Sequence, residues 1–228
     1  MKPVKLAELE QKIGYTFADK NKLLLAVTHS SYANEHKGRK KENNERLEFL
    51  GDAVLDLVLA DYLYNNAHES EGDMTKVRAS YVCENANYQY AIDLHLSDYI
   101  KVGHGEEESG GRFKKVIMAD IFEALMGAIY IDQGYAKARQ VILHIVVPYI
   151  KNPDVTFFED YKSALQEAVQ TDQKSVSYEL VKEEGPAHNR TFTTEVKVDD
   201  VSYGVGVAGS KKESEQEAAR IALSKLAK

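Results

Sequence analysis

The sequence predicts an all-α domain followed by a small α+β domain with the element order α-β-β-β-α. Up to about residue 150, apolar residues recur at steps of three and four, which is the period of a helix. Beyond the next few residues they alternate with period two in three segments separated by turn residues. Pro148 and Pro153 lie between the two patterns, and proline restricts its own backbone and that of its predecessor. We therefore expect a first domain at 1–150, a linker at 151–157 and a second domain at 158–228.

Six segments of the first domain carry the helical period. They are 6–17, 20–32, 46–66, 74–94, 116–133 and 136–150. Two polar stretches interrupt them, a basic one at 34–44 and a charged, glycine-rich one at 102–115. We expect both stretches to be loops, and the second to be mobile.

The second domain begins and ends with a helix. The first helix is expected at 160–171 and the last at 211–228, where Ser210 is a candidate N-cap. Between them lie three alternating segments, which we interpret as strands: 176–185, 189–200 and 201–210.

Composition and charge limit the classes of function. The chain is 43% hydrophobic and 29% charged, which is typical of a globular protein. Its formal net charge is −7, so any contact with nucleic acid must depend on local basic clusters. The single cysteine, Cys83, excludes an internal disulfide and favours a reducing, cytoplasmic environment. We find no signal peptide and no apolar run of about 18 residues, so we expect no association with a membrane.

The stretch NNERLEFLGDAVLD (43–56) carries three acids on one helical face. Glu45, Glu48 and Asp52 are spaced i, i+3 and i+7, which places them within roughly 60° of one another. Leu47, Leu50, Val54 and Leu57 fall on the opposite side. We expect the first three to pack inside the domain. A solvated acidic face is one interpretation. Against it, no Lys or Arg lies at i±4 of Glu48 or Asp52, and Phe49 lies beside the acids.

A second helical stretch, 116–131, contains only two charged residues, Asp120 and Glu123, spaced i, i+3. The rest is apolar or small, so we expect the helix to be largely buried. A buried ionised carboxylate is costly unless something compensates it. The compensation could be a raised pKa, a cation, or an ion pair with one of three arginines: Arg46, Arg78 or Arg112.

If the two acidic helices pack together, their carboxylates converge. A site made only of oxygen ligands suits magnesium, with manganese as a substitute, whereas zinc prefers the Cys and His clusters that this chain lacks. Magnesium retains water and can support hydrolysis of a phosphodiester. Motifs for serine hydrolases and nucleotide binding are missing. We interpret THSS (28–31) as a helix end and not as a nucleophile.

The second domain has the character of a binding module. Lys211 and Lys212 begin its last helix, His188 and Arg190 lie in the loop GPAHNRTF, and Gln166 lies on its first helix. Three such patches suit two minor grooves of an RNA duplex and the phosphates between them. For the lysines alone, an ordinary solvated helix start is an equally simple interpretation.

These motifs resemble those of the ribonuclease III family over essentially the whole chain. NERLEFLGDAVLD (44–56) closely resembles the family signature, and 105–132 resembles its second acidic helix with the loop before it. LQE, GPAHNRTF and GSKKESEQEAA resemble the three contact regions of a double-stranded-RNA-binding domain. The chain departs from some such domains at Glu215, where they carry a third basic residue.

The resemblance implies an all-α endonuclease domain followed by a double-stranded-RNA-binding domain. It implies Glu48, Asp120, Glu123 and Asp52 as magnesium ligands. It also implies Asp52, Glu123 and Glu45 as catalytic residues, with Glu45 at the rim, where it would help contacts with substrate or partner. Gln166, His188, Lys211 and Lys212 would contact RNA, and Phe49 would lie in a homodimer interface.

The activity implied is magnesium-dependent cleavage of both strands of double-stranded RNA. The products would carry short 3′ overhangs with 5′-phosphate and 3′-hydroxyl ends, in the processing of ribosomal, messenger and transfer RNA precursors. Two alternatives remain open from the residues alone. One is a duplex-RNA-binding protein whose first domain is only a scaffold for dimers. The other is a hydrolase of small phosphates, which gives the second domain no role.

Overall fold

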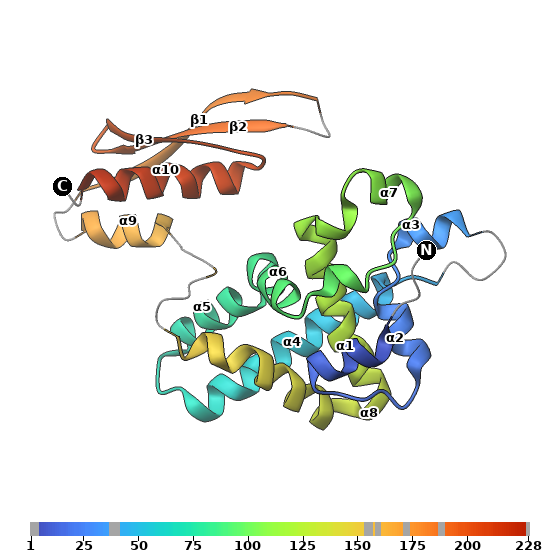
Figure 1. The fold of residues 1–228 in the computed structure, drawn as a ribbon. Helices are drawn as coiled ribbons and strands as arrows, with labels where there is room; N and C mark the ends of the chain where they lie inside the picture. Colours follow the sequence, from blue (N-terminus) through green and yellow to red (C-terminus); the bar gives the residue numbers. More distant parts are fainter. Residues whose placement is uncertain are drawn as a thin grey trace. The chain divides into compact units, whose positions relative to one another are not determined.

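The computed structural model describes residues 5–36, 42–152, 157, 161–170, 174–186 and 190–226. The chain divides into two compact units, Met1–Phe158 and Glu159–Lys228 (Figure 1). The described part of the first unit is helical, and the second unit combines a sheet with two helices. The predicted fold class is therefore confirmed. No helix in the described ranges is long and apolar enough to cross a membrane.

Helices of the first unit follow the predicted apolar stripes. They are α1 (Leu6–Ile13), α2 (Lys20–Ala26), α3 (Ser30–Glu35), α4 (Glu45–Asn66), α5 (Glu71–Val82), α6 (Glu84–Asp93), α7 (His104–Glu108) and α8 (Lys115–Ile150), with 3-10 turns η1 (Leu96–Asp98) and η2 (Gly111–Phe113). Of the basic stretch predicted as a loop, the start belongs to α3, and residues 37–41 lie outside the described ranges.

Two segments predicted as single helices are broken in the structure. The segment expected at 20–32 forms α2 and α3, with non-helical residues at 27–29. The segment expected as one helix at 74–94 is broken at Cys83, whose extended backbone ends α5 and begins α6. The predicted break between the segments 116–133 and 136–150 is confirmed, since two helical stretches of α8 meet at a kink where Gln133 and Gly134 leave helical geometry. Gly134 has φ 76°, a value that glycine adopts without strain. Pro148 lies inside α8, which continues to Ile150.

The prediction of a loop at 102–115 was wrong, because this segment folds into α7 and η2. Paired charges hold the two turns together. Lys114 donates to Glu106 at 2.6 Å, and Arg112 pairs with Glu107. Arg112 Nη1 also donates to the carbonyl of Ser97 at 2.9 Å, which ties η2 to η1. The acids that suggested a solvated loop are thus local ion-pair partners.

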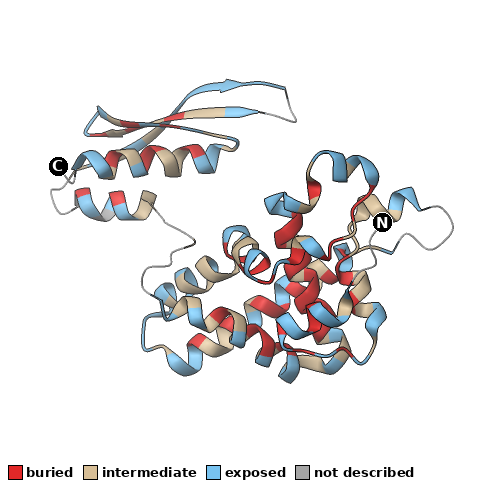
Figure 2. Ribbon diagram, in the orientation of Figure 1, coloured by how far each residue is buried: buried red, intermediate tan, exposed pale blue. Residues whose placement is uncertain are grey.

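The core of the first unit is built around α8. Figure 2 shows the buried residues gathered in the middle of this unit, and α8 packs there against α4, α6 and α2. Leu55 and Leu59 of α4 and Phe122 and Leu125 of α8 are fully buried. The ring of Tyr90 on α6 lies 5.2 Å from that of Phe122, measured between centroids. The long pair α4 and α8 therefore forms the frame on which the acidic residues stand.

In the second unit, helices pack on an antiparallel sheet of order β1-β2-β3. The elements are α9 (Tyr161–Gln170), β1 (Val176–Glu184), β2 (Thr191–Val198), β3 (Val201–Ala208) and α10 (Lys211–Leu226). Gly204 and Gly206 of β3 face α10 so closely that a methyl group on Gly206 would lie 2.2 Å from the carbonyl oxygen of Ser214. The predicted cap is confirmed, since the amide of Glu213 donates to Ser210 Oγ at 3.2 Å.

Candidate active site

Two glycines bring the acidic helices into direct backbone contact. A methyl group on Gly51 of α4 would lie 1.8 Å from the carbonyl oxygen of Glu123 on α8. In return, a methyl group on Gly127 would lie 2.2 Å from the carbonyl oxygen of Leu47. Such a crossing accepts only hydrogen at both positions. Our reading of the sequence did not use these glycines, although a glycine inside each long apolar helix was the available signal.

The crossing places the predicted acids of both helices around one point. Glu48 and Asp52 flank Gly51 on α4, while Glu123 lies at the crossing itself, one turn beyond Asp120 on α8. Glu48, Asp120 and Glu123 are half-buried, and Asp52 is exposed. Glu45 is the first residue of α4 and is exposed.

Burial and mutual repulsion perturb the acids of this cluster. Burial raises the pKa of Glu48 to about 7, with repulsion from Asp120, Glu45 and Asp52 adding to the effect. Burial likewise raises the pKa of Glu123 to about 7, with Asp52 next in importance. The pKa of Asp120 is raised to about 6, and that of Asp52 is raised as well, mainly by burial. The carboxylates therefore influence one another's charge across the helix crossing.

The buried ion pair considered from the sequence does not form. Arg78 instead lies 3.3 Å from Asp56, and Arg112 pairs with Glu107. Among the described residues no Lys, Arg or His forms an ion pair with any of the four central acids: Glu48, Asp52, Asp120 and Glu123. Their negative charge is left without a basic partner in this part of the chain.

The donor set fits a hard cation by its chemistry. Oxygen ligands that repel one another and have no basic neighbour would be stabilised by magnesium between them. In the described ranges, however, no three His, Cys, Asp or Glu side chains lie close enough together to hold a metal ion. The acids lie near one another and raise one another's pKa values, but their side chains do not form a coordination geometry in this structure.

One polar partner of the acids was missed from the sequence. Asn87 of α6 is fully buried and donates from Nδ2 to Glu123 Oε1 at 2.7 Å. This hydrogen bond lowers the pKa of Glu123 and so opposes part of the effect of burial. A lone asparagine in an amphipathic helix carries no sequence signal that separates it from a surface residue.

The motif THSS has the structural role that we predicted. His29 is the N-cap of α3, and its ring accepts a hydrogen bond from the amide of Ser31 at 3.3 Å. Ser31 Oγ in turn accepts from the amide of Gly103 at 2.9 Å. The group links α3 to the segment before α7.

An exposed apolar stripe runs along α4 beside the acids. Phe49 is 82% exposed, Leu57 56% and Tyr64 80%. Because the helical period brings these three residues to one side, they form a single face, which we call the α4 stripe. Leu57, which the helical period places opposite the acids, is exposed, whereas Leu47 and Val54 are buried. Near its end the stripe borders a groove lined in part by Ala60, Met74 and Arg78.

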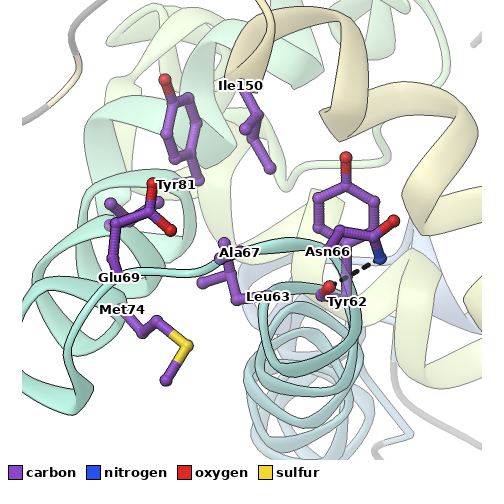
Figure 3. A pocket seen from close by; sticks show the side chains of 9 residues that line it. Tyr62, Leu63, Asn66, Ala67, Glu69, Met74, Tyr81 and Ile150 are labelled. Atoms are coloured by element: carbon purple, nitrogen blue, oxygen red, sulfur yellow. Dashed lines mark hydrogen bonds between the residues drawn. The ribbon is translucent and has the colours of Figure 1, made fainter.

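A separate cavity of about 320 Å³ lies between the end of α4, α5 and the end of α8. Figure 3 shows Tyr62 and Asn66 of α4, Tyr81 of α5 and Ile150 of α8 around it. Asn66 Nδ2 donates to the carbonyl of Tyr62 at 2.8 Å, so this amide group is hydrogen-bonded within α4. Glu69 is the only acid in the lining, so this cavity is no second acidic site.

The predicted RNA-contact residues are exposed where the structure describes them. Gln166 lies on the outside of α9, and Lys211 and Lys212 begin α10. His188 lies outside the described residues. Arg190 pairs with Glu183 at 2.6 Å.

Glu215, the departure noted in the sequence, pairs with Lys162 of α9 at 2.6 Å. The ammonium of Lys162 also lies 4.6 Å above the centre of the Tyr178 ring. Glu215 therefore holds α9 against α10 and the sheet.

Comparison with known families assigns a model to each unit. Residues 19–150 match the model described as "Ribonuclease-III-like", and residues 161–226 match the double-stranded RNA binding motif. Together these matches cover most of the chain and leave a short segment between them.

Curated relatives and solved structures agree with these matches. A protein named "Ribonuclease 3" from Bacillus cereus strain G9842 is 46% identical over 219 residues, which cover 95% of this chain and 89% of that protein. A protein of the same name from Geobacillus sp. strain WCH70 is 46% identical over 224 residues, which cover 97% of this chain and 91% of that protein. Among solved structures, the nuclease domain of a ribonuclease III from Campylobacter jejuni is 41% identical with a TM-score of 0.60, covering 68% of this chain and all of that one. A second structure of that domain is 42% identical with a TM-score of 0.58, and it covers 63% of this chain and 97% of that one. It is described as flexible in a region involved in dimer formation.

Proposed function

Because the chain belongs to the ribonuclease III family and is an endoribonuclease acting on double-stranded RNA, we propose that magnesium, held by the acids at the α4–α8 crossing, is its cofactor. The observation that carries the proposal is the set of four carboxylates without a basic partner in the described residues. Manganese would serve as a substitute, since it accepts the same ligands. When bound, the metal would stabilise the charge that develops on the phosphate and activate water for attack.

Each acid has a place that suits its proposed role. Glu48, Asp120 and Glu123 are half-buried and would be the principal ligands. Asp52 is exposed on the same side of α4, where it would meet both the metal and the attacking water, as would Glu123. Glu45, at the exposed start of α4, would hold substrate at the rim. The chain itself would thus orient the phosphate, and bound magnesium would keep ionised the carboxylates whose pKa values lie near 7 in the metal-free protein.

The second unit would hold the duplex. Gln166 on α9 would lie in a minor groove, and Lys211 and Lys212 would bind phosphates. They stand at the N-terminus of α10, where backbone amides and the helix dipole also favour an anion. His188, outside the described ranges, would supply the loop contact in the second groove.

We also propose that the protein acts as a homodimer through the α4 stripe. An apolar face of this extent beside a groove is unusual on a monomer. A two-fold axis would place the same helix from two subunits face to face, so that Phe49 of one copy meets the far end of the stripe on the other. Two sites would then face one duplex, and each would cut one strand.

The expected products follow from two sites acting on opposite strands. Cuts offset across the duplex would leave short 3′ overhangs with 5′-phosphate and 3′-hydroxyl ends. Structured precursors of ribosomal, messenger and transfer RNA in the cytoplasm are the substrates that we propose.

Replacing Glu123 by alanine separates catalysis from binding. The variant should cut labelled duplex RNA at least about a thousandfold more slowly, since a lost metal ligand removes several kcal/mol of transition-state stabilisation. It should bind the duplex as tightly as the wild type, measured by gel shift in chelator. Glu8→Ala on α1, whose side chain pairs with Lys5 at 3.4 Å, is the matched control. Normal cutting by the Glu123 variant would show that the acids have been assigned wrongly. Absence of magnesium binding by the wild type in calorimetry would instead favour a scaffold.

A further inference from the structure

Asn87 lies fully buried between the end of α5 and α8, next to the proposed site. Its Nδ2 donates to Glu123 Oε1 at 2.7 Å and to the carbonyl of Val82 at 3.1 Å. The carbonyl oxygen of Val82 can only accept, and so can the ionised carboxylate of Glu123, so together they fix which end of the amide faces the acid. The side chain is therefore oriented by two hydrogen bonds and cannot exchange its nitrogen for its oxygen without losing both.

The other end of this amide has no compensating contact. Asn87 Oδ1 is buried and accepts no hydrogen bond from the described residues. An unpaired buried carbonyl destabilises the fold, and an apolar side chain of similar size would fill the same space without this cost. Packing therefore does not explain why the position is an asparagine, whereas donation to Glu123 and to the carbonyl of Val82 does.

Because of this hydrogen bond, the two carboxylate oxygens of Glu123 have different surroundings. Oε1 is taken by Asn87, while Oε2 accepts no hydrogen bond from residues in the described ranges. A carboxylate that is held by one oxygen keeps its rotamer and leaves the second oxygen available. Another bond from a side-chain amide of α6 to a carboxylate is exposed, since Gln89 donates to Asp93 at 2.9 Å.

We propose that Asn87 is a positioning residue that holds the carboxylate of Glu123 by Oε1 so that Oε2 is presented to magnesium. This inference rests on the proposed function, because it needs Glu123 to be a ligand. Asn87 itself touches neither metal nor substrate. Its contribution is to the affinity and geometry of the metal site.

The test measures magnesium binding to the metal-free protein by calorimetry. Asn87→Leu removes the donor at nearly constant volume and should weaken magnesium binding by about tenfold or more, as loss of such supporting bonds does elsewhere. Its affinity for duplex RNA in chelator should be unchanged. Gln89→Leu, which removes an amide-to-carboxylate bond from the same helix away from the acids, should bind magnesium like the wild type.

The outcomes are distinguishable. A wild type that binds no magnesium contradicts the proposed function, whereas a folded Asn87→Leu protein with the wild-type affinity overturns only the role of Asn87. If Asn87→Leu does not fold, Asn87→Ala is measured in its place with the same criterion. Failure of both variants to fold, in thermal melts where Gln89→Leu melts normally, would also overturn the proposal, because the amide would then be needed for the fold itself.

Discussion

Glu123 combines a backbone contact, a buried hydrogen bond and a raised pKa in one residue of the first unit. Its carbonyl contacts Gly51 across the helix crossing, its carboxylate is held by Asn87, and its pKa is raised to about 7 by burial and by neighbouring acids. The acids themselves could be recognised from the sequence, because charged residues in an apolar helix demand compensation. Asn87 could not, since its meaning depends on a contact between residues 36 positions apart.

At the same scale, the exposure of Leu57 shows a limit of helical periodicity. An apolar residue on a helix predicts burial, and the sequence alone does not say whether the cover comes from the same chain. Leu47 and Val54 are buried by α8, while Leu57 and Phe49 remain outside.

The stability of the metal-free protein should fall as pH rises. Glu48 and Glu123 have pKa values of about 7 in the folded protein, above their ordinary value of 4.5, so the folded state holds protons that the unfolded state releases. The free energy of unfolding should therefore decrease from about pH 5 to pH 7 and level off above about pH 8. Thermal melts in chelator across this range measure the trend. The double variant Glu48→Gln, Glu123→Gln should lose most of the slope, and an unchanged slope in that variant would contradict this origin.

At the scale of elements, the crossing of α4 and α8 decides where the acids meet. Both helices were predictable from their apolar period. Their close approach was not, because it depends on two glycines that face each other only after folding. The prediction of a loop at 102–115 was wrong for a related reason. Acidic and basic residues of this segment form ion pairs with each other, and these pairs support short helical turns.

Gly51→Ala should be among the most damaging small substitutions in the first unit. The added methyl group would lie 1.8 Å from the carbonyl oxygen of Glu123, and a backbone atom cannot move aside without separating the helices. We expect a loss of about 3 kcal/mol or more of unfolding free energy, with loss of magnesium binding. Gly72→Ala on α5, where the nearest atom is 3.8 Å away, should be neutral or slightly stabilising. Equal stability of the two variants in urea denaturation would contradict the close crossing.

Glu215→Lys should destabilise the second unit. The substitution removes the partner of Lys162 and sets two positive charges side by side between α9 and α10. Because Lys162 is partly exposed, we expect a cost of about 1 kcal/mol in the free energy of unfolding. Adding Lys162→Glu should restore stability. A melt unchanged by the single substitution would show that the pair does not hold α9 in place.

At the scale of the whole molecule, the sequence predicted two units of different class, and the structure has both. The change of hydrophobic period carried this prediction, since periods of 3.6 and 2 require different elements. Oligomeric state is less accessible to such reasoning. The sequence of one chain shows which residues of a helix are apolar. It does not show whether a second chain covers them.

Phe49→Asp should convert the proposed dimer into monomers. Replacing this aromatic ring by a charge removes a large contact from the proposed apolar interface, so dissociation should be at least about thirtyfold more favourable, or about 2 kcal/mol. Analytical ultracentrifugation over a concentration series measures the change. Phe113→Asp is the matched control, because Phe113 is 65% exposed but lies on η2, away from the α4 stripe. A dimer that survives Phe49→Asp and not Phe113→Asp would place the interface elsewhere.

The central claim is that carboxylates at the α4–α8 crossing use magnesium to cut double-stranded RNA. Its most direct test is the incubation of the purified protein with end-labelled duplex RNA and with the matching single strand, each with magnesium and with chelator. We expect both strands of the duplex to be cut in magnesium at positions offset toward 3′ overhangs, and no cutting in chelator or of the single strand. An intact duplex in magnesium, or cutting that persists in chelator, would contradict the claim.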